Sequence, residues 1–243
     1  MSEPNGAIGL DLLAKAGAVV DALASGRELS VADLATASGQ PVSSTYRLVT
    51  SLLTLGWLEP GATRARYRLG PTVLRLAAAS EDQTELLGLA HPILRDLAMT
   101  LGGSVDLVVR TEDLAVCVDK VSTTGVFGAF PRIGAFAPLS TTAAGRVLLA
   151  HLPPPERRRV GGDEAEADAD RERGFVETAD PFQPAVACLA AACLNHRGEA
   201  EAAIGISGFR RSLLGDGSTA TEQLLAAAEA ISVALGHGEG AVR

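Results

Sequence analysis

Residues 30–56 read SVADLATASGQPVSSTYRLVTSLLTLG, and this stretch decides how the N-terminal part folds. Ser30 and Asp33 have the Ser-x-x-acid spacing of a capping box, which predicts the start of a short helix. Proline is tolerated in the first turn of a helix, so Pro41 predicts the start of a second helix, which ends at Gly56. Two short helices joined by a tight turn form a helix–turn–helix unit.

The second of these helices is predicted to have two different faces. At about 100° per residue, the side chains that turn toward the core are Val42, Tyr46, Val49, Leu52 and Leu53. The opposite face carries Ser43, Ser44, Arg47 and Ser51. Hydroxyl groups can bond phosphates and base edges, and an Arg can read guanine or clamp a phosphate. We therefore expect this face to contact DNA.

A basic hairpin follows the second helix. Residues 57–59 and 65–69 are two short extended stretches around a Pro-Gly turn. Arg64, Arg66 and Arg68 occupy alternate positions, so they are predicted to project together toward the DNA backbone or minor groove, as the wing of a winged helix does. The alternative is a three-helix packing unit with a solvated basic hairpin.

Charge is distributed unevenly along the chain. The formal net charge is 21 − 29 = −8, which by itself does not indicate a nucleic-acid partner. Residues 1–80 carry seven basic and six acidic side chains, which leaves 14 basic and 23 acidic side chains in the remainder. Between Ser43 and Arg75, five Arg stand against the single acidic residue Glu59. Positive charge is therefore concentrated at the predicted DNA-binding unit.

Composition excludes several classes of protein. With 243 residues and 47% hydrophobic side chains, the chain can form two soluble domains. Three Cys without a CxxC motif argue against a disulfide framework and favour a reducing, cytoplasmic location. Four scattered His give no metal-ligand spacing, so we predict neither a metal nor a cofactor. No secretion leader or membrane span is recognisable.

The second part of the chain alternates strands and helices, beyond a candidate domain boundary at residues 80–84. Helices are predicted over residues 85–101, 142–152 and 219–235, and strands over 105–109, 114–118, 185–193 and 200–207. The first two strands pair across a turn at residues 111–113. We expect the acid-rich stretch 161–174 to be a solvated loop and Lys120 to be a solvated strand end.

Small side chains share one face of the last two strands. Val186, Cys188 and Ala190 alternate on one strand, and Gly205 and Ser207 alternate on the next. Side chains this small would leave space above that face of the sheet unfilled, which predicts a ligand pocket there. The alternative is that Ala-rich strands simply pack close to a helix.

Residues 8–80 resemble the winged helix–turn–helix of the IclR family of bacterial transcription regulators. The resemblance rests on Leu34-Ala35-x-x-x-Gly39-x-Pro41-x-Ser43-Ser44-x-x-Arg47-Leu48, Leu55-Gly56-Trp57-Leu58 and Tyr67-Arg68-Leu69-Gly70. It continues through PLSTTAAGRVLLA at residues 138–150, Arg173-Gly174-Phe175, Val186-x-Cys188-x-Ala190-Ala191 and Ile204-x-Ile206-Ser207-Gly208.

The resemblance implies an α+β protein with a winged helix–turn–helix domain over residues 8–70, a linker helix over 71–83 and a GAF-like effector-binding domain with an antiparallel sheet over 84–243. It implies double-stranded operator DNA and a small organic effector, often a carboxylate or aromatic metabolite, as partners. The effector residues carried over from the family are Leu139, Ser140, Thr141, Ala144, Asp180, Cys188, Gly205 and Ser207. A homodimer or a dimer of dimers is implied, since one recognition helix reads too few base pairs to find a genomic site.

The sequence departs from the family pattern at several positions. One acid of a usual pair is replaced in Asp180-Pro181, Ala192 stands where Pro is usual, Val42 replaces a residue that is often polar or basic, and the segment 152–173 is shorter than usual. We predict a ligand-responsive transcription regulator of a metabolic operon, either activator or repressor. The alternatives are a DNA-binding protein without a ligand and a small-molecule hydrolase, although the common hydrolase motifs are missing.

Overall fold

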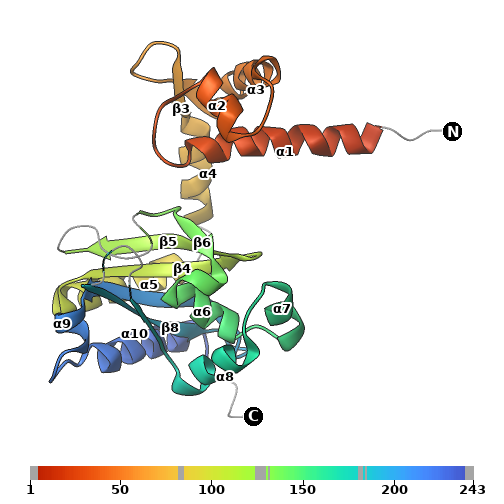
Figure 1. The fold of residues 1–243 in the computed structure, drawn as a ribbon. Coiled ribbons are helices and arrows are strands. Elements are labelled where there is room, and N and C mark those ends of the chain that lie inside the picture. The colour runs from red at the N-terminus through yellow and green to blue at the C-terminus, as the bar shows by residue number, and fades with distance from the viewer. Residues whose placement is uncertain are drawn as a thin grey trace. The chain divides into compact units, whose positions relative to one another are not determined.

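The structure is a computed structural model that describes residues 5–81, 85–123, 130, 132–179, 183 and 185–238 (Figure 1). The chain divides into two compact units, Met1–Gln83 and Thr84–Arg243. Each unit contains its own buried hydrophobic clusters, so each is stabilised by its own packing.

The first unit combines helices with a small antiparallel sheet of order β1-β3-β2 (Figure 1). Its elements are α1 (Asn5–Leu23), β1 (Leu29–Ser30), α2 (Val31–Ala37), α3 (Val42–Thr54), β2 (Leu58–Pro60), β3 (Arg66–Leu69) and α4 (Pro71–Glu81). The predicted capping box is confirmed, because Ser30 Oγ accepts from Asp33 N at 3.2 Å and Asp33 Oδ2 accepts from Ser30 N at 3.0 Å. The predicted hairpin is present as β2 and β3, and β1 adds a strand too short to leave a pattern in the sequence.

The buried face of α3 differs from the predicted one. Val42 and Tyr46 are 56% and 61% exposed, so the prediction that they face the core is wrong. The stripe that packs inward instead begins at Thr45, whose hydroxyl can be buried because it donates to Pro41 O at 3.1 Å within the helix. The buried side chains of α3 are Thr45, Leu48, Val49 and Leu52.

The second unit is built on a six-stranded antiparallel sheet of order β6-β5-β4-β9-β8-β7 (Figure 1). Its strands are β4 (Ser104–Thr111), β5 (Leu114–Ser122), β6 (Phe136–Pro138), β7 (Val176–Ala179), β8 (Val186–Leu194) and β9 (Ala200–Phe209). The predicted pairing of β4 with β5 is confirmed, with Thr111 opposite Leu114 at the turn. The two later predicted strands are also present, and they pair with Cys188 opposite Ser207.

Helices cover both faces of this sheet (Figure 1). On one face α5 (Glu85–Leu101) and α10 (Ala220–Ala234) pack against a large apolar cluster, and the short α9 (Arg210–Leu214) packs at its edge. On the other face the 3-10 turn η1 (Leu139–Thr141) leads into α6 (Ala143–Ala150), which packs on small side chains of β8 and β9. The three helices predicted for this part of the chain are confirmed.

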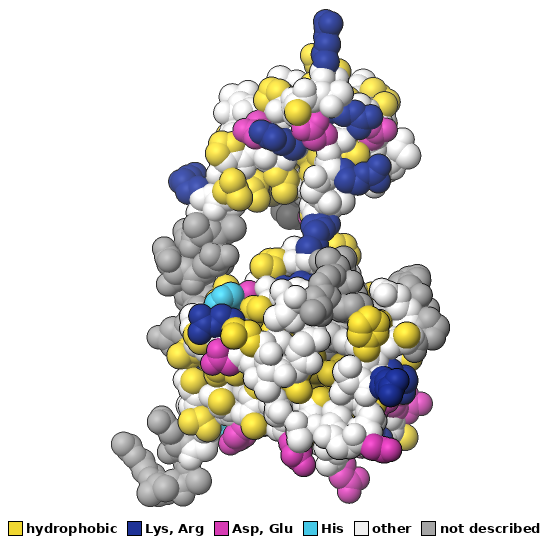
Figure 2. Space-filling model, turned by 90° about the vertical axis from the view of Figure 1, so that its left-hand side faces the viewer, with side chains coloured by type: hydrophobic (Ala, Val, Ile, Leu, Met, Phe, Trp, Pro, Cys, Tyr) yellow, Lys and Arg dark blue, Asp and Glu magenta, His cyan; other side chains and the backbone are white. Residues whose placement is uncertain are grey.

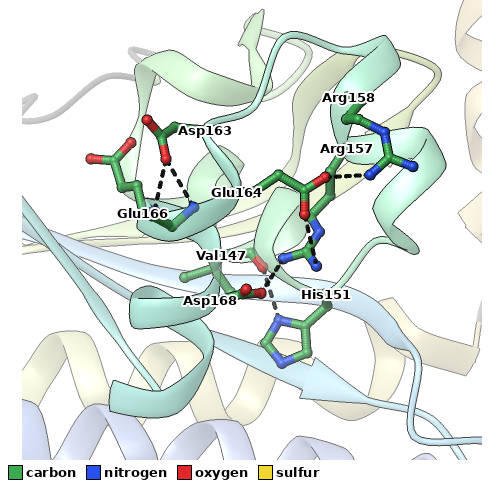
Figure 3. Close-up of polar contacts among 9 residues, drawn as sticks. Val147, His151, Arg157, Arg158, Asp163, Glu164, Glu166 and Asp168 are labelled. Atoms are coloured by element: carbon green, nitrogen blue, oxygen red, sulfur yellow. Dashed lines mark hydrogen bonds and ion pairs between the residues drawn. The ribbon is translucent and has the colours of Figure 1, made fainter.

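The acid-rich stretch 161–174 forms a helix, so the prediction of a solvated loop is wrong. After α7 (Pro154–Arg159), α8 runs over Glu164–Arg173. The Asp163 carboxylate caps α8 by accepting from the backbone N–H of its first turn, at 2.9 and 3.1 Å (Figure 3). The helix dipole also favours the acidic side chains of the first turn, Glu164 and Glu166.

Arginine side chains of α7 and α6 neutralise several acids of α8. Arg157, whose side chain is only 6% exposed, pairs with Asp168 at 2.7 Å, and Arg158 pairs with Glu164 at 2.8 Å (Figure 3). Arg146 of α6 reaches Asp170 at 2.6 Å, and the Asp170 side chain is 3% exposed. These ion pairs join α8 to α6 and α7, the two helices that precede it in the sequence.

The Arg146–Asp170 contact gives a test of this helix. Removing the buried carboxylate by Asp170→Ala leaves the partly buried Arg146 without its main partner, so we expect the free energy of unfolding to fall by about 2–4 kcal/mol. The matched control is Glu166→Ala, which removes a 56% exposed partner of the same Arg146 and should change stability by less than about 1 kcal/mol. Urea unfolding measures both, and equal effects of the two substitutions would contradict the buried position of Asp170.

Candidate functional site

The outer face of α3 carries the residues predicted to contact DNA. Ser43, Ser44, Arg47 and Ser51 are all exposed. Arg47 forms no ion pair with any residue that the structure describes, so its guanidinium is available to a ligand. Tyr46 lies beside it and was missed in the sequence because an aromatic at that spacing fitted an apolar stripe. Its exposed ring adds a surface that can contact a thymine methyl group.

The three wing arginines differ in their surroundings. Arg68 pairs with Glu59 across the hairpin at 2.7 Å. Arg66 donates to Glu28 O at 2.8 Å and is half-buried. Arg64 lies in the exposed turn before β3 and pairs with none of the described residues. Of the three guanidinium groups, that of Arg64 is therefore the most available to a phosphate.

Glu28 anchors the turn that carries Arg64, and no motif in the sequence points to this role. Its carboxylate accepts hydrogen bonds from Ala62 N at 2.6 Å and Thr63 N at 3.1 Å. These two N–H groups hold the pKa of Glu28 below its ordinary value. On the face shown in Figure 2, Lys and Arg side chains are spread over the surface of this first unit. Positive charge is concentrated between Ser43 and Arg75, where five Arg stand against one Glu, and the wing turn within this stretch is fixed by Glu28.

A small cavity of about 20 Å³ lies in the second unit, between α6 and the sheet. Its roof is the first turn of α6, where Thr142 Oγ1 accepts from Gly145 N at 3.0 Å. The N–H groups of Ala143 and Ala144 have no partner within the helix, as is usual in a first turn. The residues that line the cavity are Asp106, Phe130, Thr142, Ala143, Ala144, Cys188, Leu189, Gly205, Ile206 and Ser207.

Four of the predicted effector residues line this cavity, namely Ala144, Cys188, Gly205 and Ser207. Leu139 is buried just below α6, whereas Ser140 and Thr141 are exposed on η1 and do not line it. Asp180 lies outside the described residues. Strand pairing explains why the predicted residues of β8 and β9 meet at the cavity. Cys188 lies opposite Ser207, and Ala190 lies opposite Gly205, so these four positions on the two strands share one face of the sheet.

A buried ion pair lies at the floor of the cavity. Lys120 Nζ donates to Asp106 Oδ1 at 2.5 Å, and the two side chains are only 8% and 5% exposed. The prediction that Lys120 is a solvated strand end is wrong, because its side chain is buried where it pairs with Asp106, the residue opposite it on β4. The polar residue Asp106 inside an apolar strand was the signal available in the sequence.

Burial also sets the chemistry of the remaining polar groups. It raises the pKa of Cys117 and of Cys193 to about 12, which keeps both thiols protonated and poorly nucleophilic. Among the described residues, no group of His, Cys, Asp and Glu could hold a metal ion. None of the described helices is both long and apolar enough to cross a membrane.

Known protein families match both parts of the chain. The family described as the IclR helix–turn–helix domain matches residues 12–61, and the family described as bacterial transcriptional regulator IclR C-terminal matches residues 78–161. The chain is 31% identical over 245 residues to the glycerol operon regulatory protein of Streptomyces griseus, which covers 93% of this chain and 96% of that protein.

Solved structures agree on the fold. An IclR transcriptional regulator from Alicyclobacillus acidocaldarius matches with a TM-score of 0.79 at 21% identity, over 93% of this chain and 98% of that one. An IclR homologue from Microbacterium hydrocarbonoxydans, complexed with 4-hydroxybenzoate, matches with a TM-score of 0.77 at 20% identity, over 92% and 98% of the two chains.

A helix–turn–helix unit followed by an α+β unit with an antiparallel sheet defines a class of DNA-binding transcription regulator. The chain belongs to the IclR family of bacterial transcriptional regulators, as the expected resemblance indicated.

The buried Asp106 gives a pH-dependent test of the cavity floor. Burial raises the pKa of Asp106 from 3.8 to about 6, although Lys120 opposes the shift. The folded state then binds this proton more tightly than the unfolded state, so the stabilising contribution is complete below about pH 4 and is lost as pH rises through about 6. Asp106→Asn removes the titration, so the stability of wild type relative to the variant should fall between about pH 4 and 7.

Urea unfolding of both proteins across this range measures the difference. Asp216→Asn, at an exposed loop position, is the control and should track wild type at every pH. A difference between wild type and Asp106→Asn that stays constant with pH would contradict the raised pKa.

Proposed function

We propose that this regulator responds to a small organic effector bound between α6 and the sheet, and that it controls a metabolic operon through the outer face of α3 and the wing. Double-stranded operator DNA and the effector are its two ligands, and the protein acts in the cytoplasm. The observation that carries the effector role is the cavity beneath the first turn of α6, whose lining includes the polar side chains of Asp106, Thr142, Cys188 and Ser207.

The DNA surface is supported by exposure and charge. Ser43, Ser44, Arg47 and Ser51 share the outer face of α3, and Arg64 projects from a turn fixed by Glu28. Arg66 and Arg68 contribute positive charge nearby, even though each has a partner within the unit. Base contacts from a recognition helix and phosphate contacts from a wing are the usual division of labour in such units.

The protein is proposed to act as a homodimer or a dimer of dimers. A single recognition helix contacts too few base pairs to select one site in a genome, whereas two related by a twofold axis read two half-sites. Exposed apolar side chains are present on α1 and α4, among them Leu13 at 70% and Leu74 at 74% exposure. Such side chains are typical of surfaces that a second copy covers.

The effector is proposed to be a carboxylate or an aromatic metabolite. Helix N-termini bind carboxylates through unpaired N–H groups, and the first turn of α6 offers those of Ala143 and Ala144. The Microbacterium homologue was solved with such an acid, 4-hydroxybenzoate. A cavity of about 20 Å³ has room for one water molecule only, so the effector must part α6 from the sheet, and this movement is a means of signalling.

Two other functions are less well supported. A DNA-binding protein without a ligand would have no use for a buried charge pair beside an internal cavity. A hydrolase would need an activated nucleophile, and the Ser207 hydroxyl donates to Cys188 Sγ at 3.3 Å rather than to a His. We therefore assign no catalytic role and no cofactor.

The DNA surface is tested by two substitutions with different expected signatures. Arg47→Ala should weaken operator binding by about 1–3 kcal/mol because a base or paired phosphate contact is lost. Arg64→Ala should weaken binding to all sequences and reduce the slope of log affinity against log salt by about one unit. Fluorescence anisotropy at several salt concentrations measures both.

The control for the DNA surface is Arg95→Ala, which removes an exposed Arg of α5 in the second unit. It should leave operator affinity and the salt slope unchanged. Operator affinity that is unchanged in both folded variants, Arg47→Ala and Arg64→Ala, would refute the assignment of this surface.

The effector site is tested by adding a methyl group to its wall. A Cβ added at Gly205 would meet no atom closer than 3.8 Å, so Gly205→Ala should fold normally while filling the cavity. We expect acids that raise the melting temperature of wild type, from a panel with benzoate and 4-hydroxybenzoate, to lose at least about tenfold in affinity. Gly208→Ala, on the same strand but against Leu213, is the control. Equal affinity in both variants would place the effector elsewhere.

A further inference from the structure

A second cavity, of about 460 Å³, lies in the same unit at the other end of α6. Its walls come from the ends of β4 and α6, from α7 and α8, and from the turn before β9. Small-molecule sites have volumes of about 300–1,000 Å³, so this cavity is large enough for an organic ligand. It shares no lining residue with the effector cavity, so it is a separate feature of the fold.

Part of the lining of this second cavity is apolar. Leu148 and Leu152 lie at the end of α6 and just beyond it, Pro153 and Pro154 lead into α7, and Ala200 begins β9. Covering such a surface releases water from it, which favours a ligand with an apolar body.

The charged part of the lining leaves one cation without a partner. At the end of β4, the guanidinium of Arg110 pairs with the Glu156 carboxylate at 2.8 Å. The guanidinium of Arg171, by contrast, forms no ion pair or hydrogen bond with any residue that the structure describes. Glu199, the other acid of the lining, has its carboxylate 3.5 Å from Asn195 Nδ2 in its own turn. Arg171 is therefore the charge in this cavity that a ligand can neutralise.

His151 shows that the charge of Arg171 acts inside the cavity. The imidazole is fixed to the last turn of α6, because its Nδ1 lies 2.9 Å from Val147 O (Figure 3). Burial lowers the pKa of His151, and the charge of Arg171 also lowers it, whereas the bond to Val147 acts in the opposite direction. None of the acidic side chains that the structure describes offsets Arg171 at this position. The potential beside His151 is therefore positive.

We propose that this second cavity is a binding site for an organic acid, whose carboxylate pairs with Arg171 and whose apolar body lies against the leucine and proline side chains of α6 and α7. An amine of the same shape would be repelled by Arg171. A neutral alcohol would gain the apolar contact without the ion pair.

This site goes beyond the function proposed above, because none of its residues belongs to the effector cavity. The two cavities nevertheless share one helix. Residues at the start of α6 line the first cavity, and residues at its end line the second. With eight residues, α6 is about 12 Å long, so ligands in the two cavities would contact opposite ends of the same short helix.

The test compares three molecules that share an apolar body and differ in charge, namely 3-phenylpropionate, 3-phenylpropanol and 3-phenylpropylamine. Isothermal titration of the full chain measures the affinity of each. We expect the acid to bind about tenfold more tightly than the alcohol, a moderate gain because water partly screens an exposed guanidinium, and the amine to bind most weakly. In Arg171→Gln the acid should lose this advantage while the affinity for the alcohol is unchanged.

Two control variants accompany Arg171→Gln, which should itself keep the wild-type melting temperature because Arg171 is exposed. Arg173→Gln removes the same charge from α8 at a position about 200° around the helix that does not line the cavity, and it should keep the wild-type preference for the acid. Gly205→Ala fills the effector cavity and should still bind one 3-phenylpropionate per chain.

The outcomes separate this inference from the proposed function. If Arg171→Gln binds the acid as tightly as wild type, the second site is refuted. Binding that is lost in Gly205→Ala but kept in Arg171→Gln would place the acid in the effector cavity, so the proposed function would stand without a second site. Equal affinity of wild type for the acid and the alcohol would refute the preference for an anion. Binding that is weakened in Arg171→Gln alone supports the second site, even if no acid enters the effector cavity.

Discussion

The close approach of α6 to the sheet is the constraint on which the second unit depends. Gly145 makes it possible, because a Cβ at this position would lie 2.3 Å from the carbonyl oxygen of Leu139. Only glycine lets η1 fold directly beneath the first turn of the helix. Ala144 then lies over Gly205, whose added Cβ would be 3.9 Å from the Ala144 methyl. Small side chains on both surfaces thus bring helix N–H groups within reach of the strands.

Buried charge is concentrated around the same helix. Below α6 lies the Asp106–Lys120 pair, and beside it Arg146 reaches the buried Asp170 of α8. Such pairs seldom add net stability compared with apolar side chains, because desolvation offsets their attraction. Here the two ion pairs fix the positions of elements and place polar groups inside the unit. The Arg146–Asp170 pair joins α8 to α6, and the Asp106–Lys120 pair gives polarity to a floor that would otherwise be apolar.

In the first unit, one set of residues holds the scaffold together and another set forms the proposed DNA-binding surface. Buried residues such as Leu48 and Leu52 hold α3 against the rest of the unit, and Glu28 holds the wing turn through two backbone N–H groups. Arg47 and Arg64, which pair with none of the described residues, lie on the surface that this scaffold presents. Preorganised placement of this kind lowers the entropic cost of binding DNA.

Much of the fold could be predicted from local sequence, because its signals act over a few residues. The capping box at Ser30, the proline at Pro41, and the alternation along β4, β5, β8 and β9 each specify an element through backbone sterics and side-chain period. The pairing of β8 with β9 also brings Cys188, Gly205 and Ser207 together, as their alternation indicated.

Only the tertiary structure decided which face of α3 is buried, that the acidic segment is helical and that Lys120 is buried. Tyr46 fits an apolar stripe but lies outside, because Thr45 satisfies its own hydroxyl and takes the inner position. The acidic segment is helical because Arg146 and Arg157, from other helices, neutralise it. Lys120 is buried because β4 places Asp106 opposite it. In each case the outcome depends on a residue that is distant in the sequence, or on which face of the element is covered by other elements. The periodicity of one segment contains no information about these tertiary contacts.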